Sequence, residues 1–364
     1  MNYLYFLYIE FLAKHNIPQL FGDITFFGIP ITIIFVALLI IILALVLVER
    51  KLLGWFTQRK GPNRVGFWGV LQTIADALKL LCKENITPSP VNRFLFNLAP
   101  ILMFTPALVV LCIIPYSSEF TFLNTETNLL LFIFFAAIPA LSVLIGGKAS
   151  NNKYSLVGAI RGISQILAYE LPIAFSVMGI MVLSSSMNLT AITLAQSSKN
   201  GVLSWFWLPC IIGFVIMFIC MLAELNRCPF DLPEAESELI CGYNTEYSGM
   251  RFALFYLGEY TLLFANALFL SVLFLGGYLS PFGKYLSPVL FSGSLGGILL
   301  YFEQAFWLLL KSFLIIFVVI WIRATMPRMA AFDLLKFSWT YLLPISIFNL
   351  FLMVLIKYLG GLYV

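Results

Sequence analysis

Long apolar runs separated by polar segments recur along this chain. An α-helix needs about 20 apolar residues to cross a bilayer core, and eight segments meet this requirement. We therefore predict an all-α, polytopic membrane protein in which residues 1–364 form a single membrane domain with eight transmembrane helices. The predicted spans are Ile24–Val48, Phe94–Ile114, Leu129–Ile145, Leu167–Ser184, Trp205–Ala223, Phe252–Leu275, Phe302–Ile322 and Trp339–Leu359.

A ninth apolar stretch, Leu286–Leu300, is short and contains one proline and three glycines, so we expect a loop or a shallow re-entrant segment. With eight spans, 16 of the 21 Lys and Arg residues lie in loops on one side. By the positive-inside rule that side faces the cytoplasm or the mitochondrial matrix, and both termini face outside. A ninth span would move the basic inner loop 323–338 to the outer side.

The first inner loop, 49–93, contains a different pattern. Between Val65 and Lys83 the polar residues recur at steps of four, three and four, with apolar residues on the opposite face. This spacing predicts an amphipathic helix at the membrane interface, which serves either as an anchor or as one wall of a polar pocket. The outer segment 1–23 has no basic stretch before an apolar run, so we expect neither a signal peptide nor a transit peptide.

Composition excludes most other classes of protein. Hydrophobic residues make up 61% of the chain and charged residues 10%, whereas soluble proteins carry about 25% charged residues. Cytosolic enzymes, disordered proteins and nucleic-acid binders are excluded, so no nucleic acid is expected as a partner. The chain has one histidine, no C-x-x-C pair among six cysteines, and no glycine-rich nucleotide motif. We therefore expect no metal, haem, flavin or iron–sulfur cluster in this chain.

Two inner loops carry opposite charge. The loop 49–93 has a net charge of +5, and the loop 224–251 has a net charge of −4. Both also contain apolar side chains, which favours packing over independent solvation, so we expect the loops to form a polar pocket at the membrane surface. Two independently solvated loops are the alternative.

Ionisable residues inside the predicted spans are a second anomaly, because each costs about 2.5–3.5 kcal/mol at a helix centre. Glu170, Glu224 and Glu259 lie in or beside spans and could form a proton path or, alternatively, structural pairs between helices. Glu303 and Lys311 are eight residues apart in one span, and we expect them to form such a structural pair.

Three motifs follow one another along the chain. The first is Gln58-Arg59-Lys60-Gly61-Pro62-Asn63-Arg64-Val65-Gly66, the second Ala223-Glu224-Leu225-Asn226-Arg227-Cys228-Pro229-Phe230-Asp231-Leu232, and the third Arg323-Ala324-Thr325 with Pro327-Arg328. In this order and topology the chain resembles the quinone-site membrane subunits of respiratory complex I, the proton-translocating NADH:quinone oxidoreductase of mitochondria and bacteria. The resemblance covers nearly the whole chain.

The resemblance implies a core subunit that forms the entrance and wall of the quinone tunnel and begins a chain of buried acids coupled to proton pumping. It holds no redox centre; quinone, expected to be ubiquinone, is the substrate. The implied tunnel residues are Glu49, Arg50, Arg59, Asp76, Arg227, Phe230, Glu234, Glu236, Glu238, Arg323 and Arg328. The implied proton path contains Glu170, Glu224, Glu259 and Glu246.

The same resemblance implies as partners the peripheral quinone-site subunits, neighbouring small membrane subunits and the lipid bilayer. The 36 phenylalanines, the single histidine and the lack of a targeting segment favour an organelle-encoded chain, and hence the mitochondrial inner membrane, with the bacterial plasma membrane as the alternative. The chain departs from the family at Ala330 and Phe332, where an arginine and an aspartate are usual. Alternatives are a subunit of a membrane-bound hydrogenase or of a plastoquinone-reducing complex, and a stand-alone proton-coupled transporter. The acids at 234, 236 and 238 favour the quinone-reducing branch.

Overall fold

The computed structural model describes residues 19–197, 201–233, 236–283, 285 and 294–361. Helices dominate these ranges and no strand occurs in them, in agreement with the predicted all-α class. The long helices are α2 (Gln19–Phe56), α4 (Arg93–Ile113), α5 (Asn128–Ala149), α6 (Lys153–Ser184), α8 (Ile211–Glu224), α10 (Gly249–Phe274), α12 (Ser294–Thr325) and α14 (Leu343–Gly361). The shorter elements are η1 (Phe67–Gly69), α3 (Gln72–Cys82), α7 (Leu189–Ala195), η2 (Gly201–Ser204), α9 (Glu236–Leu239), η3 (Gly242–Asn244), α13 (Ala331–Phe337) and the π-helical turn η4 (Ser338–Leu342).

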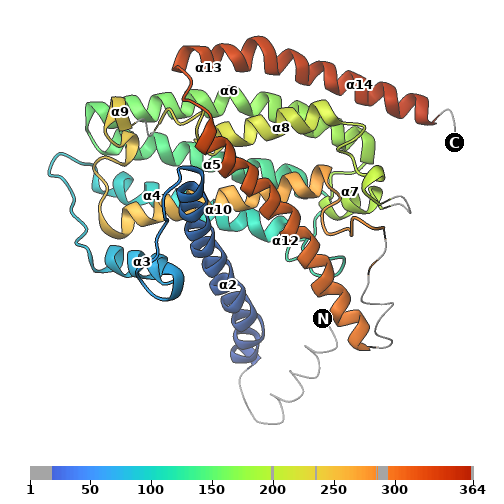
Figure 1. The fold of residues 1–364 in the computed structure, drawn as a ribbon, viewed down its shortest axis with the longest axis horizontal. Helices are drawn as coiled ribbons and strands as arrows, with labels where there is room; N and C mark the ends of the chain where they lie inside the picture. Colours follow the sequence, from blue (N-terminus) through green and yellow to red (C-terminus); the bar gives the residue numbers. More distant parts are fainter. Residues whose placement is uncertain (1–18, 198–200, 234–235, 284, 286–293, 362–364) are drawn as a thin grey trace.

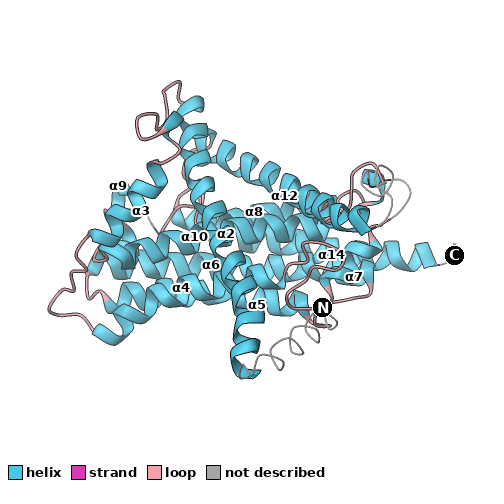
Figure 2. Ribbon diagram, turned by 90° about the horizontal axis from the view of Figure 1, so that it is seen from below, coloured by secondary structure: helices cyan, strands magenta, loops and turns pink. Residues whose placement is uncertain are grey.

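Helices α4, α5, α6, α8 and α10 run side by side along the long axis, whereas α2 and α12 are inclined to them (Figure 1). Figure 2 shows α3 and α9 together at one end of the molecule and α7 near the other. Helix α10 forms the core, since every side chain from Gly258 to Phe274 is buried. The rings of Phe132 and Phe269 stack at 3.6 Å between α5 and α10.

Six helices in the described ranges are long and apolar enough to cross a membrane. They cover six of the predicted spans, and α2 and α8 lie over the other two. Helix α8 has 14 residues, fewer than a straight crossing needs. The count of eight spans therefore stays a prediction. Residues 286–293 lie outside the described ranges, but 294–300 belong to α12 rather than to a loop.

The predicted amphipathic helix over 65–83 is shorter in the structure, because α3 covers only Gln72–Cys82. Gly66 and Gly69 both have a φ of 73°, in the left-handed region that favours glycine, and they interrupt the helix. A Cβ at Gly69 would lie 2.2 Å from the Pro62 carbonyl oxygen, so only glycine fits this turn. Along α3 the apolar side chains of Ile74, Leu78 and Leu81 are exposed.

The expected ion pair between Lys311 and Glu303 is wrong. The Lys311 ammonium donates instead to the carbonyl oxygens of Leu275, Gly277 and Leu279 at 2.7, 2.8 and 2.7 Å. It also lies 4.0 Å from the centre of the Trp205 ring. These carbonyls follow the C-terminal end of α10, where unpaired oxygens and the helix dipole attract a cation. Lys311 thus fixes α12 to the end of the core helix.

Candidate functional site

Glu49, near the end of α2, joins three segments that lie far apart in the sequence. Its carboxylate is 3% exposed, and its Oε1 accepts a hydrogen bond from Arg227 Nη1 at 2.5 Å. Arg323, in the last turn of α12, donates to the same oxygen. The Arg227 guanidinium also lies 4.7 Å from the centre of the Tyr260 ring on α10. One buried carboxylate thus holds two cations where α2, α8 and α12 end.

The turn after α8 places Arg227. Asn226 has a φ of 50°, which ends the helix at Glu224 and turns the chain back. Gln165 of α6 is fully buried, and its amide donates to the carbonyl oxygens of Ala223 at 2.7 Å and Phe230 at 2.8 Å. A polar side chain in an apolar helix therefore fixes both ends of this turn. Gln165 was not among the predicted site residues, because it carries no charge and lies just before the predicted span Leu167–Ser184, whereas α6 begins at Lys153.

The two oppositely charged loops are in contact, as predicted. The ion pair between them joins Glu49, an acid of the basic loop, to Arg227, a base of the acidic loop, so it does not arise from their net charges. Besides the Glu49–Arg227 pair, the backbone N–H of Ile86 donates to Ser248 Oγ at 3.1 Å, and that of Met250 donates to Asn85 Oδ1 at 3.1 Å. The first loop therefore lies against the second at both of its ends.

Arg328 pairs with Asp231, an acid of the second motif that was absent from the predicted site. Arg328 Nη2 lies 3.0 Å from Asp231 Oδ2, and Met329 N–H donates to the Pro229 carbonyl at 3.1 Å. Burial raises the pKa of the Asp231 carboxyl above its ordinary value, and the positive charges of Arg328 and Arg323 oppose this rise. These contacts fix the loop after α12 to the turn after α8.

A small polar cavity of about 40 Å³ lies inside this cluster. It is large enough for a water molecule. Its lining consists of Asn226, Arg227, Cys228, Asp231, Tyr256, Glu259 and Arg323. Glu259 accepts a hydrogen bond from the Tyr243 hydroxyl at 2.6 Å. Of the predicted intramembrane acids, Glu259 is thus the one that lies beside the arginine cluster.

A larger basic cavity of about 520 Å³ opens beside the first motif. Arg50, Arg59, Lys60 and Arg64 line it together with uncharged residues of the loop. Arg50 Nη1 lies 2.5 Å from Asp76 Oδ2, and Gln72 donates to the other carboxylate oxygen of Asp76 at 3.1 Å. Asp76 thereby holds α3 against α2 at the edge of this cavity.

Glu170 and Glu224 line a separate cavity of about 30 Å³ between α5, α6, α8 and α10. The Asn266 side chain donates to Glu224 Oε2 at 3.1 Å. Phe132, Met217 and Phe269 form apolar walls around it. The cavity has room for a water molecule, which could bridge the two carboxyls. Asn266 was not among the predicted site residues, because no charge marks it.

The remaining predicted site residues are dispersed. Glu238 pairs with Arg161 at 2.6 Å and is largely exposed, and Glu246 accepts from Asn152 Nδ2 at 2.7 Å. Phe230 is buried and packs edge-on against Tyr169, with ring centres 5.6 Å apart. Glu234 and the Glu236 side chain lie outside the described residues.

Ala330 and Phe332, where the chain differs from the family pattern, lie at the start of α13. Ala330 lies at the N-terminal cap of α13, and the Phe332 side chain is exposed. Asp333 lies in the first turn of α13, where a negative charge is favourable. In the part of the chain that the structure describes, no three His, Cys, Asp or Glu side chains gather closely enough to hold a metal ion.

Comparison with known proteins identifies the family. The sequence profile of NADH dehydrogenase matches residues 29–354. The H subunit of the NADH-quinone oxidoreductase of Bacillus cytotoxicus is 45% identical over 333 residues, which is 91% of this chain and 94% of the relative. The corresponding subunits of Bacillus thuringiensis and Bacillus cereus are 44% identical with the same coverage. This membrane chain of long apolar helices and clustered loop charges therefore belongs to the NADH dehydrogenase family.

Proposed function

We propose that this chain is the core membrane subunit at the quinone site of a proton-pumping NADH:quinone oxidoreductase. Its relatives are named as subunits of an NADH-quinone oxidoreductase, which favours this enzyme over the hydrogenase and plastoquinone alternatives and over a stand-alone transporter. The chain carries no redox centre of its own. Electrons reach the quinone from partner subunits, and this chain supplies the walls and the charges around it.

The observation that carries the proposal is the single Glu49 carboxylate shared by Arg227 and Arg323. The Arg227 side chain is 9% exposed and that of Arg323 is 38% exposed, and both line the polar cavity together with Asp231 and Glu259. Guanidinium donors held in this way orient a polar carbonyl headgroup and stabilise negative charge that develops when a quinone is reduced. Beside it, the basic cavity at Arg50, Arg59 and Arg64 forms the entrance of the tunnel.

The membrane arrangement follows from the same proposal. The chain crosses the bilayer eight times, and α3 lies in the interface with its exposed leucines in the lipid. Both termini face the outer side, and the motif-bearing loops face the inner side and contact the peripheral quinone-site subunits. Small membrane subunits pack against the exposed helix faces. The membrane is the coupling membrane of a respiratory chain, and the bacterial relatives favour the bacterial plasma membrane over the mitochondrial inner membrane.

Reduction of a quinone to a quinol consumes two electrons and two protons, so the site must be connected to a source of protons. Glu259 lines the arginine cavity, and Glu170 and Glu224 line the next cavity toward the core. We assign these acids, with Glu246, to the start of the path that couples quinone reduction to proton translocation. Ubiquinone is the proposed substrate.

The test is photolabelling of native membranes with a quinone-headgroup probe, followed by peptide mapping. We expect labelled peptides from 49–83 or 224–251, and excess quinone should suppress the label. Label confined to other subunits, in membranes that still oxidise NADH with quinone, would contradict the tunnel assignment. Purification is a second test. A stand-alone transporter would be stable without partner subunits, whereas we expect this chain to be stable only within a large complex.

A further inference from the structure

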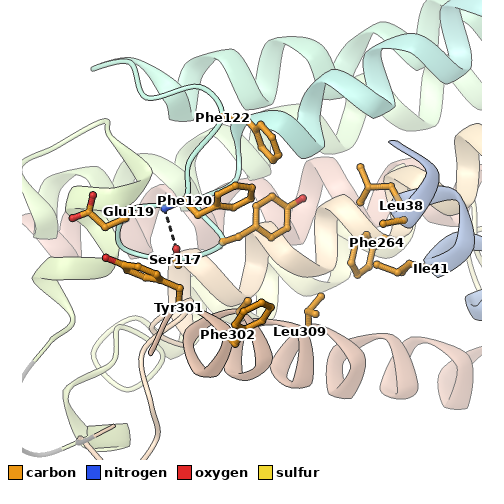
Figure 3. Close-up of a pocket in the computed structure, with 13 residues that line it drawn as sticks. Leu38, Ile41, Ser117, Glu119, Phe120, Phe122, Phe264, Tyr301, Phe302 and Leu309 are labelled. Carbon is orange, nitrogen blue, oxygen red and sulfur yellow. Dashed lines mark hydrogen bonds between the residues drawn. The ribbon is translucent and has the colours of Figure 1, made fainter. Parts of the chain in front are cut away.

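An apolar cavity of about 530 Å³ lies between α2, α10, α12 and the segment 116–122 (Figure 3). One end is formed by Leu38, Ile41 and Phe264, and Phe302 and Leu309 line its side on α12. Leu309 precedes Arg323 by 14 residues on α12, which is about 21 Å along a helix. At the other end of the cavity, Ile41 lies about two helical turns from Glu49 and Phe264 about one turn from Tyr260, but the cavity shares no lining residue with the polar cavity of the charged cluster.

The apolar lining of this cavity favours a hydrocarbon chain as its occupant. Protein interiors contain few voids larger than a water molecule, and cavities lined by apolar side chains do not hold water. The lining belongs to helices that we place in the bilayer, and the Phe302 side chain at the edge is 70% exposed. A lipid chain can enter from the surrounding bilayer and cover these side chains.

The length of the cavity fits one lipid leaflet. Its lining on α12 runs from Tyr301 to Leu309, about 12 Å along the helix axis. One leaflet contributes about half of a hydrocarbon core of about 30 Å. A single acyl chain fits this depth, whereas a transmembrane helix from a partner would need the full thickness.

The mouth of the cavity carries a negative charge. Glu119 is exposed and lies beside Tyr301 at the end opposite to Leu38 (Figure 3). The described lining includes no Lys or Arg. This arrangement attracts an ammonium group and repels a headgroup with net negative charge.

We propose that this cavity is a binding site for a phospholipid of the outer leaflet with an ammonium-bearing headgroup, of the phosphatidylethanolamine type. One acyl chain occupies the cavity, and the ammonium lies against Glu119. The lipid fills the contact between α2 and α12 on the side of the membrane opposite to the quinone site.

The experiment uses the intact complex in nanodiscs of phosphatidylethanolamine and phosphatidylglycerol at a fixed ratio, with a trace of phosphatidylethanolamine carrying a photoreactive acyl chain. We expect labelled peptides that contain residues 37–41 and 301–309, and excess unmodified phosphatidylethanolamine should suppress the label. Ala305→Trp fills the cavity and should lower this label about tenfold. The matched control is Leu355→Trp on the exposed face of α14, which should leave the label unchanged. Leu38→Trp replaces Ala305→Trp if the latter fails to assemble.

The headgroup assignment has its own arm. Glu119→Gln should reduce the preference for the phosphatidylethanolamine probe over a phosphatidylglycerol probe about threefold, the effect of one exposed ion pair. NADH:quinone activity should not change, because Glu119 is remote from the charged cluster. Equal labelling of wild type by both probes would overturn the headgroup. Absence of label from both peptides would overturn the lipid site. Cross-links, formed in a separate experiment, between these peptides and residues 1–18 or another subunit would also overturn it.

Discussion

Arg227 Nη1 lies 2.5 Å from Glu49 Oε1, although 178 positions separate the two residues. The contact joins the end of α2 to the turn after α8, and Arg323 of α12 completes it. Because both arginines contact one buried carboxylate, replacing either arginine changes the electrostatic environment of the other. The cluster is thus the point at which the C-terminal ends of three helices, α2, α8 and α12, depend on one another.

Glu49→Gln tests this dependence. The substitution keeps the size of the side chain but removes the carboxylate that Arg227 and Arg323 share, and breaking a buried pair costs about 3–5 kcal/mol. We expect quinone reductase activity to fall at least tenfold, while NADH oxidation by a hydrophilic acceptor continues in proportion to the assembled complex. Glu126→Gln, at an exposed acid on another loop, is the control. Full quinone reductase activity in Glu49→Gln would remove the cluster from the site.

The pair of Asp231 and Arg328 calls for a double-mutant cycle. Both side chains are partly exposed, so we expect a coupling energy of about 1 kcal/mol in thermal inactivation of the complex. Arg328→Gln leaves Asp231 without its cation and should be more harmful than the double variant with Asp231→Asn. Additive effects of the two substitutions would show that the loop after α12 is held by its backbone contacts alone.

The sequence pattern predicted the positions of the helices more accurately than it predicted the contacts between side chains. Long apolar runs mark membrane helices because the bilayer requires them, and six predicted spans coincide with apolar helices of sufficient length. The break in the 65–83 helix could not be read from periodicity, because it depends on the left-handed turns at Gly66 and Gly69. The boundary of α12 was also wrong by several residues, since glycine weakens a helix without ending it.

The sequence predicted that the two charged loops would meet, but not which side chains would form ion pairs. Opposite net charges indicated the contact between the loops, whereas helix packing decides that Glu49 pairs with Arg227 and Arg323. Uncharged polar residues such as Gln165 and Asn266 gave no signal of charge, yet they fix the turn and the acid beside them. We predicted that Lys311 would pair with Glu303, the nearest acid on its helix. Its acceptors are instead backbone carbonyl oxygens, whose positions cannot be predicted from residue types.

Lys311→Met should weaken the attachment of α12 to the end of α10. It removes three hydrogen bonds to carbonyl oxygens, each worth about 1 kcal/mol net. We expect less assembled complex and a shorter half-life of its quinone reductase activity on heating, with unchanged KM for quinone. Lys336→Met, at an exposed lysine on α13, is the control. A raised KM with normal half-life would instead connect Lys311 to the substrate.

Glu224→Gln separates electron transfer from proton translocation. Glu224 shares a water-sized cavity with Glu170 and accepts a hydrogen bond from Asn266. The amide cannot take up a proton at neutral pH, so protons pumped per NADH oxidised should fall at least twofold in proteoliposomes, with slower quinone reduction. NADH oxidation by a hydrophilic acceptor should persist, which distinguishes this effect from failed assembly. Asn266→Ala removes the hydrogen bond but keeps the carboxyl, and should have a smaller effect in the same direction. An unchanged proton ratio in Glu224→Gln would show that this carboxyl shapes the packing of α6, α8 and α10 without carrying protons.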